Sequence, residues 1–296
     1  MADKIKVLFD TDIGSDIDDA VCLAYLLRQP RCELMGVTTV TGEPVKRAML
    51  ASAVCQAAGR DDVPIHPGTE DPLIMPIRQA VPQQAERLSK WPHRKDLMPN
   101  SAIEFMRQVI HAHPNEITLL AVGPMTNVGL LFAADPKIPS LLKQLVLMCG
   151  VFTTQIPHSP HREWNAWGDA HATAIVYAAP VKPHLSVGLD VTLQCRMMAD
   201  EVRKRFKAPP LNVVVDLAEV WFRRADRITF HDPLAATLIF EPDICQYAEG
   251  KVDVELASPR LRGMTHWRTN TRDKPHKIAL HVDPTRFFDH YFAVTG

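Results

Sequence analysis

The sequence predicts an α/β protein with a mostly parallel central sheet flanked by helices. Short apolar runs of strand length alternate with helical segments along the 296 residues, and this alternation is typical of a parallel sheet with both faces covered. No internal repeat and no linker divides the chain. We therefore expect a single α/β domain over residues 1–296.

The expected elements follow in order along the chain. The apolar run at residues 5–9 predicts a buried strand, and residues 20–27 predict a helix that stops before Pro30. Further strands are expected at residues 33–40, 117–122, 145–148, 187–191, 252–256 and 277–282. Further helices are expected at residues 45–58, 101–111, 170–179, 199–206, 213–224, 233–240 and 287–292, with one more from about residue 126.

Two local patterns refine this outline. Ser101 and Glu104 have the spacing of a capping box at the start of a helix. The proline- and glutamine-rich residues 79–99 are expected to form a surface excursion, and so are residues 153–162. Ligands of open α/β sheets bind beyond the carboxyl ends of the strands, so the loops that follow the strands carry the candidate chemistry.

Composition excludes several classes of protein. The chain has 33 basic and 34 acidic residues, with a net charge of −1, so no basic field indicates a nucleic-acid partner. Its apolar runs are too short to span a membrane, and its first residues lack the layout of a signal peptide. The cysteines form no CxxC pair and predict buried, reduced thiols in a cytoplasmic protein. They are Cys22, Cys32, Cys55, Cys149, Cys195 and Cys245.

The most informative segment is the loop after the first expected strand, DTDIGSDIDD at residues 10–19. It holds five carboxylates that repel one another unless a positive group binds between them. A charged capping turn is the alternative, but a cap needs only one acidic group. Oxygen ligands without a nearby cysteine or histidine pair favour Ca²⁺ or Mg²⁺ over zinc. The spacing does not fit an EF-hand.

This loop, followed by a helix from Ala20, resembles the nucleoside hydrolases, whose usual form is DTDPGxDD. Ile13 replaces the proline here, and two extra residues precede the aspartate pair. Three further segments match in the family's order: AVGPMTN at 121–127, EWN at 163–165 and HDP at 231–233. Each segment alone is an ordinary turn, loop or helix start, so the resemblance depends on their combination.

The resemblance implies a Rossmann-like nucleoside hydrolase fold and Ca²⁺-dependent hydrolysis of the N-glycosidic bond of a ribonucleoside. It implies that water bound to the metal attacks, with Asp12 as its base. The implied metal ligands are Asp12, Asp19, Asp232 and the Val122 carbonyl. The implied ribose contacts are Asp18, Glu163 and Asn165, with Asp10 and Asp16 in supporting positions.

Leaving-group chemistry and substrate choice are less determined. His231 is the natural acid for the departing base, while Trp164, Trp167 and Trp221 either frame that base or belong to the core. Glu43 stands where many family members carry asparagine, which predicts an extra negative charge near the ribose or the metal. Substrate choice therefore stays open, and a modified ribosyl compound is one candidate.

Two other functions compete with a calcium-dependent nucleoside hydrolase. Asp10 and Asp12 after an apolar strand also suggest a haloacid-dehalogenase-like phosphohydrolase, although Gly14 departs from that pattern. The other alternative is a non-catalytic ribonucleoside- or metal-binding protein on the same fold. For the enzyme we expect a small-molecule nucleoside substrate, a homodimer or homotetramer, and a cytoplasmic role in purine or pyrimidine salvage.

Overall fold

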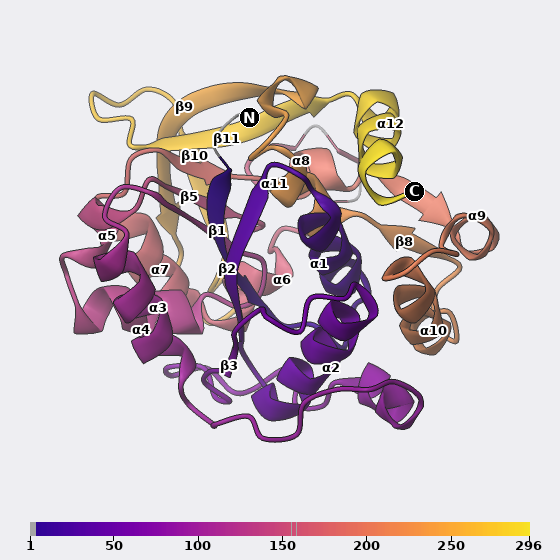
Figure 1. The fold of residues 1–296 in the computed structure, drawn as a ribbon. Helices are drawn as coiled ribbons and strands as arrows, with labels where there is room; N and C mark the ends of the chain where they lie inside the picture. Colours follow the sequence, from indigo (N-terminus) through magenta and orange to yellow (C-terminus); the bar gives the residue numbers. More distant parts are fainter. Residues whose placement is uncertain (1–3, 155, 158) are drawn as a thin grey trace.

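A mostly parallel, nine-stranded sheet crosses the part of the protein that the computed structural model describes, residues 4–154, 156–157 and 159–296 (Figure 1). Its strands are β1 (Ile5–Thr11), β2 (Cys32–Thr39), β3 (Ile65–Pro67), β4 (Ile117–Ala121), β5 (Gln144–Leu147), β6 (His184–Ser186), β9 (Cys245–Val254), β10 (Thr265–Arg268) and β11 (His276–Val282). The order is β10-β9-β11-β6-β5-β4-β1-β2-β3. Only β9 pairs antiparallel with its neighbours β10 and β11, so the predicted fold class is confirmed.

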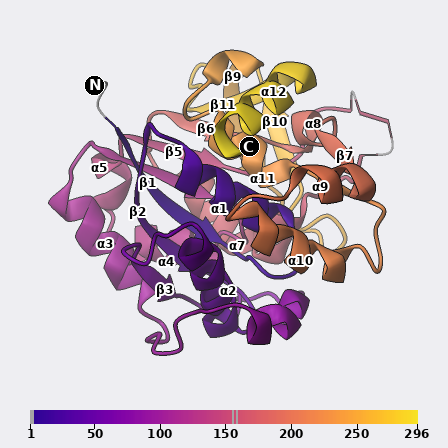
Figure 2. The ribbon, with the colours of Figure 1, turned by 45° about the vertical axis from the view of Figure 1, so that its right-hand side comes forward.

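Helices cover both faces of this sheet (Figures 1 and 2). The longer ones are α1 (Asp18–Arg28), α2 (Pro44–Ala57), α3 (Ala102–Ala112), α4 (Thr126–Ala134), α7 (Ala170–Ala178), α10 (Leu211–Trp221) and α12 (Pro284–Thr295). The shorter ones are η1 (Gln83–Lys90), α5 (Ile138–Leu141), α6 (Trp164–Gly168), α8 (Leu189–Thr192), α9 (Ala199–Arg205), α11 (His231–Thr237) and η2 (Pro242–Ile244). A separate ribbon joins β7 (Arg196–Met198) to β8 (Arg227–Thr229).

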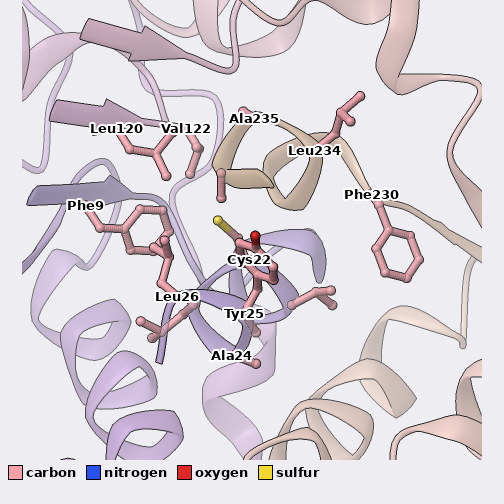
Figure 3. Packing of buried hydrophobic residues seen from close by; sticks show 14 of the residues in the cluster. Phe9, Cys22, Ala24, Tyr25, Leu26, Leu120, Val122, Phe230, Leu234 and Ala235 are labelled. Atoms are coloured by element: carbon pink, nitrogen blue, oxygen red, sulfur yellow. The ribbon is translucent and has the colours of Figure 1, made fainter. Parts of the chain in front are cut away.

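The sheet separates two apolar clusters. Along β1, Phe9 points into the cluster beneath α1 and α2, and Leu8 into the one beneath α3, α4 and α7. Helix α1 is buried along almost its whole length, which explains its nearly continuous apolar sequence. Figure 3 shows it between Phe9 and Leu120 of the sheet and Leu234 of α11. This packing fixes the first turns of α1 and α11 against each other.

One expected strand is wrong. At residues 187–191 the apolar alternation suggests a strand, but β6 ends at Ser186 and α8 begins at Leu189. The carboxylate of Asp190 accepts hydrogen bonds from the amides of Phe152 at 2.9 Å and Thr153 at 2.7 Å, which anchors the short helix. Leu189 is buried in either conformation, so an apolar pattern this short does not distinguish the two.

The capping box is also wrong. The Ser101 hydroxyl donates to the Met98 carbonyl at 2.8 Å instead of accepting from the helix, and Glu104 binds Arg107. Residues 79–99 include η1 and are not merely superficial, since Gln84 is fully buried. The described residues of 153–162 contain no helix or strand, as expected.

Other expectations agree with the structure. All six cysteines are buried and free, as their apolar surroundings predict. None of the described helices combines the length and apolar character needed to cross a membrane. The first three residues, on which the expected absence of a signal peptide partly depends, lie outside the described residues.

Candidate active site

The candidate site is a cavity of about 890 Å³ at the carboxyl ends of β1, β4 and β5. Asp12 follows β1, Val122 follows β4 and Met148 follows β5, and all three residues line the cavity. Strand β2, which follows β1 in the chain, pairs with one edge of β1, and β4, which comes later, pairs with the other edge of β1. This reversal of strand order opens the crevice in which α/β proteins bind ligands.

Three carboxylates meet at this cavity. Asp18 and Asp19 lie in the first turn of α1 and Asp232 in that of α11, and their oxygen atoms lie within 4.8 Å of one another. The Asp232 amide donates to Asp18 Oδ2 at 3.2 Å, which joins the two helix starts. The Asp12 amide donates to Asp19 Oδ1, also at 3.2 Å. These oxygen donors have the chemistry that a hard divalent cation prefers.

The electrostatics of the cluster also fit a cation. Burial raises the pKa of Asp18, Asp19 and Asp232 well above the usual value, and repulsion between the carboxylates adds to it. Burial likewise raises the pKa of Asp10 to about 7 and that of Asp16 to about 6. A bound cation favours the charged forms that burial disfavours. The residues present therefore suit a divalent metal ion.

Arg47 holds the aspartate loop in place. Its side chain is fully buried on α2 and donates from Nη1 to the Asp12 carbonyl, from Nε to the Gly42 carbonyl at 2.9 Å and from Nη2 to the Gln79 carbonyl at 2.9 Å. Sequence patterns did not single out this residue. The only feature of the sequence that could have indicated its role is its position, because the helical period places Arg47 on the apolar face of α2.

We expect Arg47→Met to lower the free energy of unfolding by about 3 kcal/mol, because several buried carbonyl groups lose their donor. Urea unfolding monitored by circular dichroism measures the change. Arg223→Met is the control, since Arg223 is exposed and pairs with Glu86 at the surface, where an ion pair contributes at most about 1 kcal/mol. Equal losses in both variants would show that Arg47 does not organise the loop.

Asn165 and Glu163 form the wall beside Val122. Asn165 Nδ2 donates to the Val122 carbonyl at 2.6 Å and to the Met148 carbonyl at 3.0 Å, so its amide group ties the ends of β4 and β5 together. The Glu163 carboxylate caps α6 and accepts from the amides of Asn165, Ala166 and, at 3.0 Å, Gly150. Both residues line the cavity.

Asp10 lies behind the cavity and not among its lining residues. Its Oδ1 accepts from Thr38 Oγ1 at 2.5 Å and from Asn127 Nδ2 at 2.8 Å, which is a supporting position. Gly123 permits the close approach of β4 to the loop, because a Cβ there would lie 3.0 Å from the Asp12 amide nitrogen. Asp16 lines the cavity and accepts from the Ile17 amide.

The predicted base-binding residues reach the same cavity. Trp164, Trp167 and Trp221 all line it, and the first two pack edge to face with ring centroids 5.7 Å apart. His231 Nδ1 lies 2.7 Å from the Thr192 hydroxyl. Burial, with a smaller effect of Arg196, lowers the pKa of His231 to about 4, so its imidazole is neutral at neutral pH.

Glu43 is the exception among the predicted site residues. It lies outside the cavity lining, at the start of α2 with a φ of 55°, and it pairs with Lys46. Sequence patterns also missed residues that do line the cavity, and nothing in their loops signals them. Among them are Arg78, Gln79, Arg162 and Arg224.

Comparison with known proteins identifies the class. A fold of this kind with oxygen ligands at the strand ends is typical of α/β hydrolytic enzymes that use a metal ion. The family model described as inosine-uridine preferring nucleoside hydrolase matches residues 7–289, and the chain belongs to this family. It is therefore an enzyme of a metal-dependent family that hydrolyses the N-glycosidic bond of ribonucleosides. The family resemblance seen in the sequence is confirmed, and neither alternative class is supported.

Individual relatives agree with this assignment. An inosine-uridine preferring nucleoside hydrolase of Leishmania major is 30% identical over 276 residues, covering 88% of this chain and 86% of that protein. Uridine nucleosidase 1 of Arabidopsis thaliana is 28% identical over 269 residues, covering 84% and 78%. A purine-preferring ribonucleoside hydrolase from Gardnerella vaginalis shares the fold, with a TM-score of 0.85, 22% identity and 98% of both chains covered.

Proposed function

We propose that the enzyme cleaves its ribonucleoside to free base and ribose in a Ca²⁺-dependent reaction. The observation that carries this proposal is that one oxygen atom from each of Asp18, Asp19 and Asp232 lies within 4.8 Å of the others. The cavity that these carboxylates line is also lined by Asn165 and three tryptophans, which can contact the ribose and the base. Ca²⁺ accepts carboxylate and carbonyl oxygens in variable number and geometry, whereas Mg²⁺ demands stricter octahedral geometry. Release of reducing sugar from a panel of neutral nucleosides tests the proposal, and binding without release contradicts it.

Asp12 is assigned as the general base. Burial raises the pKa of its carboxyl group, and a bound cation would favour the ionised form that a general base needs. Asp19, Asp232 and the Val122 carbonyl would hold the cation together with Asp12. When bound, the cation supplies Lewis acidity that lowers the pKa of water. Asp18 adds a further oxygen to this group and also binds ribose hydroxyls.

The remaining acidic and amide groups act on the ribose. Cleavage develops positive charge on the sugar, as in other glycoside hydrolyses, and nearby fixed anions stabilise that charge. The Nδ2 group of Asn165 is committed to two backbone carbonyls, so we assign its Oδ1 to a ribose hydroxyl. Burial raises the pKa of Glu163, and three backbone amide donors that favour its charged form offset part of this effect.

The base leaves between aromatic side chains. We assign Trp164, Trp167 and Trp221 to the aromatic frame around it, and His231 to a hydrogen bond with its leaving nitrogen. Since burial keeps the imidazole neutral, His231 contributes as a hydrogen-bond donor through Nε2 while Nδ1 accepts from Thr192.

We expect His231→Ala to slow hydrolysis of inosine by about 10²-fold or more, because a poor leaving group needs the hydrogen bond that His231 donates. A nitrophenyl riboside carries an activated leaving group and should lose far less. Steady-state kinetics on both substrates measure the difference, and Thr192→Val serves as a milder variant of the same contact. Equal losses on the two substrates would remove His231 from the leaving-group role.

The proposal extends to the setting of the enzyme. Six buried, free thiols support a reducing, cytoplasmic location. Release of a free base and ribose supports a role in purine or pyrimidine salvage. The assembly is proposed as a homodimer or homotetramer, and light scattering of the purified protein tests it.

A further inference from the structure

Two arginine side chains share one tryptophan in the active-site cavity. The guanidinium carbon of Arg78 lies 3.7 Å from the centroid of the Trp167 ring, and that of Arg162 lies 4.2 Å from it. All three residues line the cavity that contains the aspartates. The reactive end of this cavity is therefore acidic, while another part of it is strongly basic.

Among the described residues, these two positive charges lack counter-ions. No described carboxylate pairs with Arg78 or Arg162, and Arg78 Nε is buried without a hydrogen-bond partner in the same part of the chain. Burial, and next the charge of Arg162, lower the pKa of Arg78. Two positive charges held close together favour the binding of an anion beside them, just as the clustered aspartates favour a cation. A guanidinium group is also suited to two-point binding of phosphate or carboxylate.

The backbone holds both arginines close to the reacting groups. Arg78 precedes Gln79, whose side-chain Oε1 accepts from Trp164 Nε1 at 2.6 Å and whose carbonyl accepts from Arg47. Arg162 precedes Glu163, which caps α6. Each arginine therefore adjoins a residue that is fixed in the wall of the site, so an anion bound by the pair would belong to the same ligand as the ribose.

We propose that the substrate is a ribonucleoside that carries an anionic group, either a phosphate on the ribose or a carboxylate on the base, and that Arg78 and Arg162 select it. This inference rests on the proposed function. A neutral nucleoside leaves both guanidinium groups without an anion, whereas each charge-assisted hydrogen bond contributes about 10- to 100-fold in affinity. The reaction itself is unchanged: the bond from C1′ to the base nitrogen breaks, water oxygen bonds to C1′, and a proton passes to the base.

Substrate kinetics test the selection. We expect kcat/KM for uridine 5′-monophosphate or for 6-carboxyuridine to exceed that for uridine by at least about tenfold. Arg78→Gln and Arg162→Gln should each lower this anionic-to-neutral ratio by about tenfold, and Arg162→Lys should restore part of it. Arg223→Gln, which removes an exposed charge paired with Glu86, should leave the ratio unchanged.

Product binding provides a measurement that does not depend on turnover. Titration calorimetry with ribose 5-phosphate against ribose, and with 6-carboxyuracil against uracil, shows whether the anion is on the sugar or on the base. Tighter binding of one anionic member, lost in Arg78→Gln, supports the inference. Equal binding within both pairs, or a preference that both arginine variants keep, would overturn it and leave the arginines as packing for Trp167. Failure of all nucleosides to react would instead contradict the proposed function.

Discussion

Asp12→Asn should lower kcat/KM by about 10³-fold or more, because the variant loses its general base and one proposed metal ligand together. The fold should survive this change. Asp12 adds to the repulsion that raises the pKa of Asp18 and Asp19, so the metal-free variant should melt no lower than the metal-free parent. Base release followed by absorbance, together with thermal melting, measures both effects.

Asp62→Asn is the matched control for this variant. Asp62 is exposed and pairs with Arg60 at 2.7 Å on the surface, so its loss should change neither rate nor melting temperature appreciably. Near-normal turnover in a folded Asp12→Asn protein would refute the assignment of the base.

Removal of the cation should lower the melting temperature, and the effect should grow as the pH rises. A ligand at a hundredfold excess over its Kd stabilises the folded state by about 2.7 kcal/mol. In the metal-free protein, the raised pKa values of Asp10 (about 7) and Asp16 (about 6) favour protonated carboxyls in the folded state. The stability that these protonated carboxyls contribute is fully present below the pKa of about 4 that they have in the unfolded chain. It is lost as the pH rises through their higher pKa values in the folded state.

The cation reverses this dependence because it requires charged carboxylates. Chelation should therefore destabilise the enzyme more at about pH 8 than at about pH 5. Calorimetric melting with Ca²⁺ and with a chelator at both pH values gives the comparison. Asp232→Asn should show a much smaller calcium effect, since it removes one of the clustered carboxylates. A calcium effect of the same size at both pH values would contradict binding by this cluster.

The residues that the sequence singled out lie mostly at the centre of this cavity, and those that it missed lie mostly in irregular loops at its margins. Asp12 and Asp19 follow the first strand, where the rule that ligands bind at strand ends applies directly, whereas Asp232 was grouped with them only through the family resemblance. The role of Arg47 could not be predicted, because its partners are backbone carbonyl groups, and every residue type has one. The cavity contacts of Gln79 likewise depend on how a long irregular loop folds back over the site.

The same contrast holds for the fold. The middle of β1, Val7 to Phe9, is an unbroken apolar run because both faces of the strand are buried there. The strand expected at residues 187–191 is a short helix in the structure. The hydrogen bonds that stabilise this helix join the Asp190 carboxylate to backbone amides of a loop that is distant in the sequence. Glu43 was expected at the ribose on family resemblance alone, whereas its ion pair with Lys46 lies outside the cavity lining.

A calcium titration of the metal-free enzyme, with bound ion and base release followed in the same samples, tests the central claim most directly. Uridine and inosine serve as neutral substrates, and the preferred anionic nucleoside can be added. The account predicts that base and ribose are released in equal amounts, and that the rate of release rises with the fraction of chains that hold one bound ion. Asp232→Asn should lose both ion binding and turnover. Full turnover in the presence of a chelator, or bound ion without any base release, would contradict it.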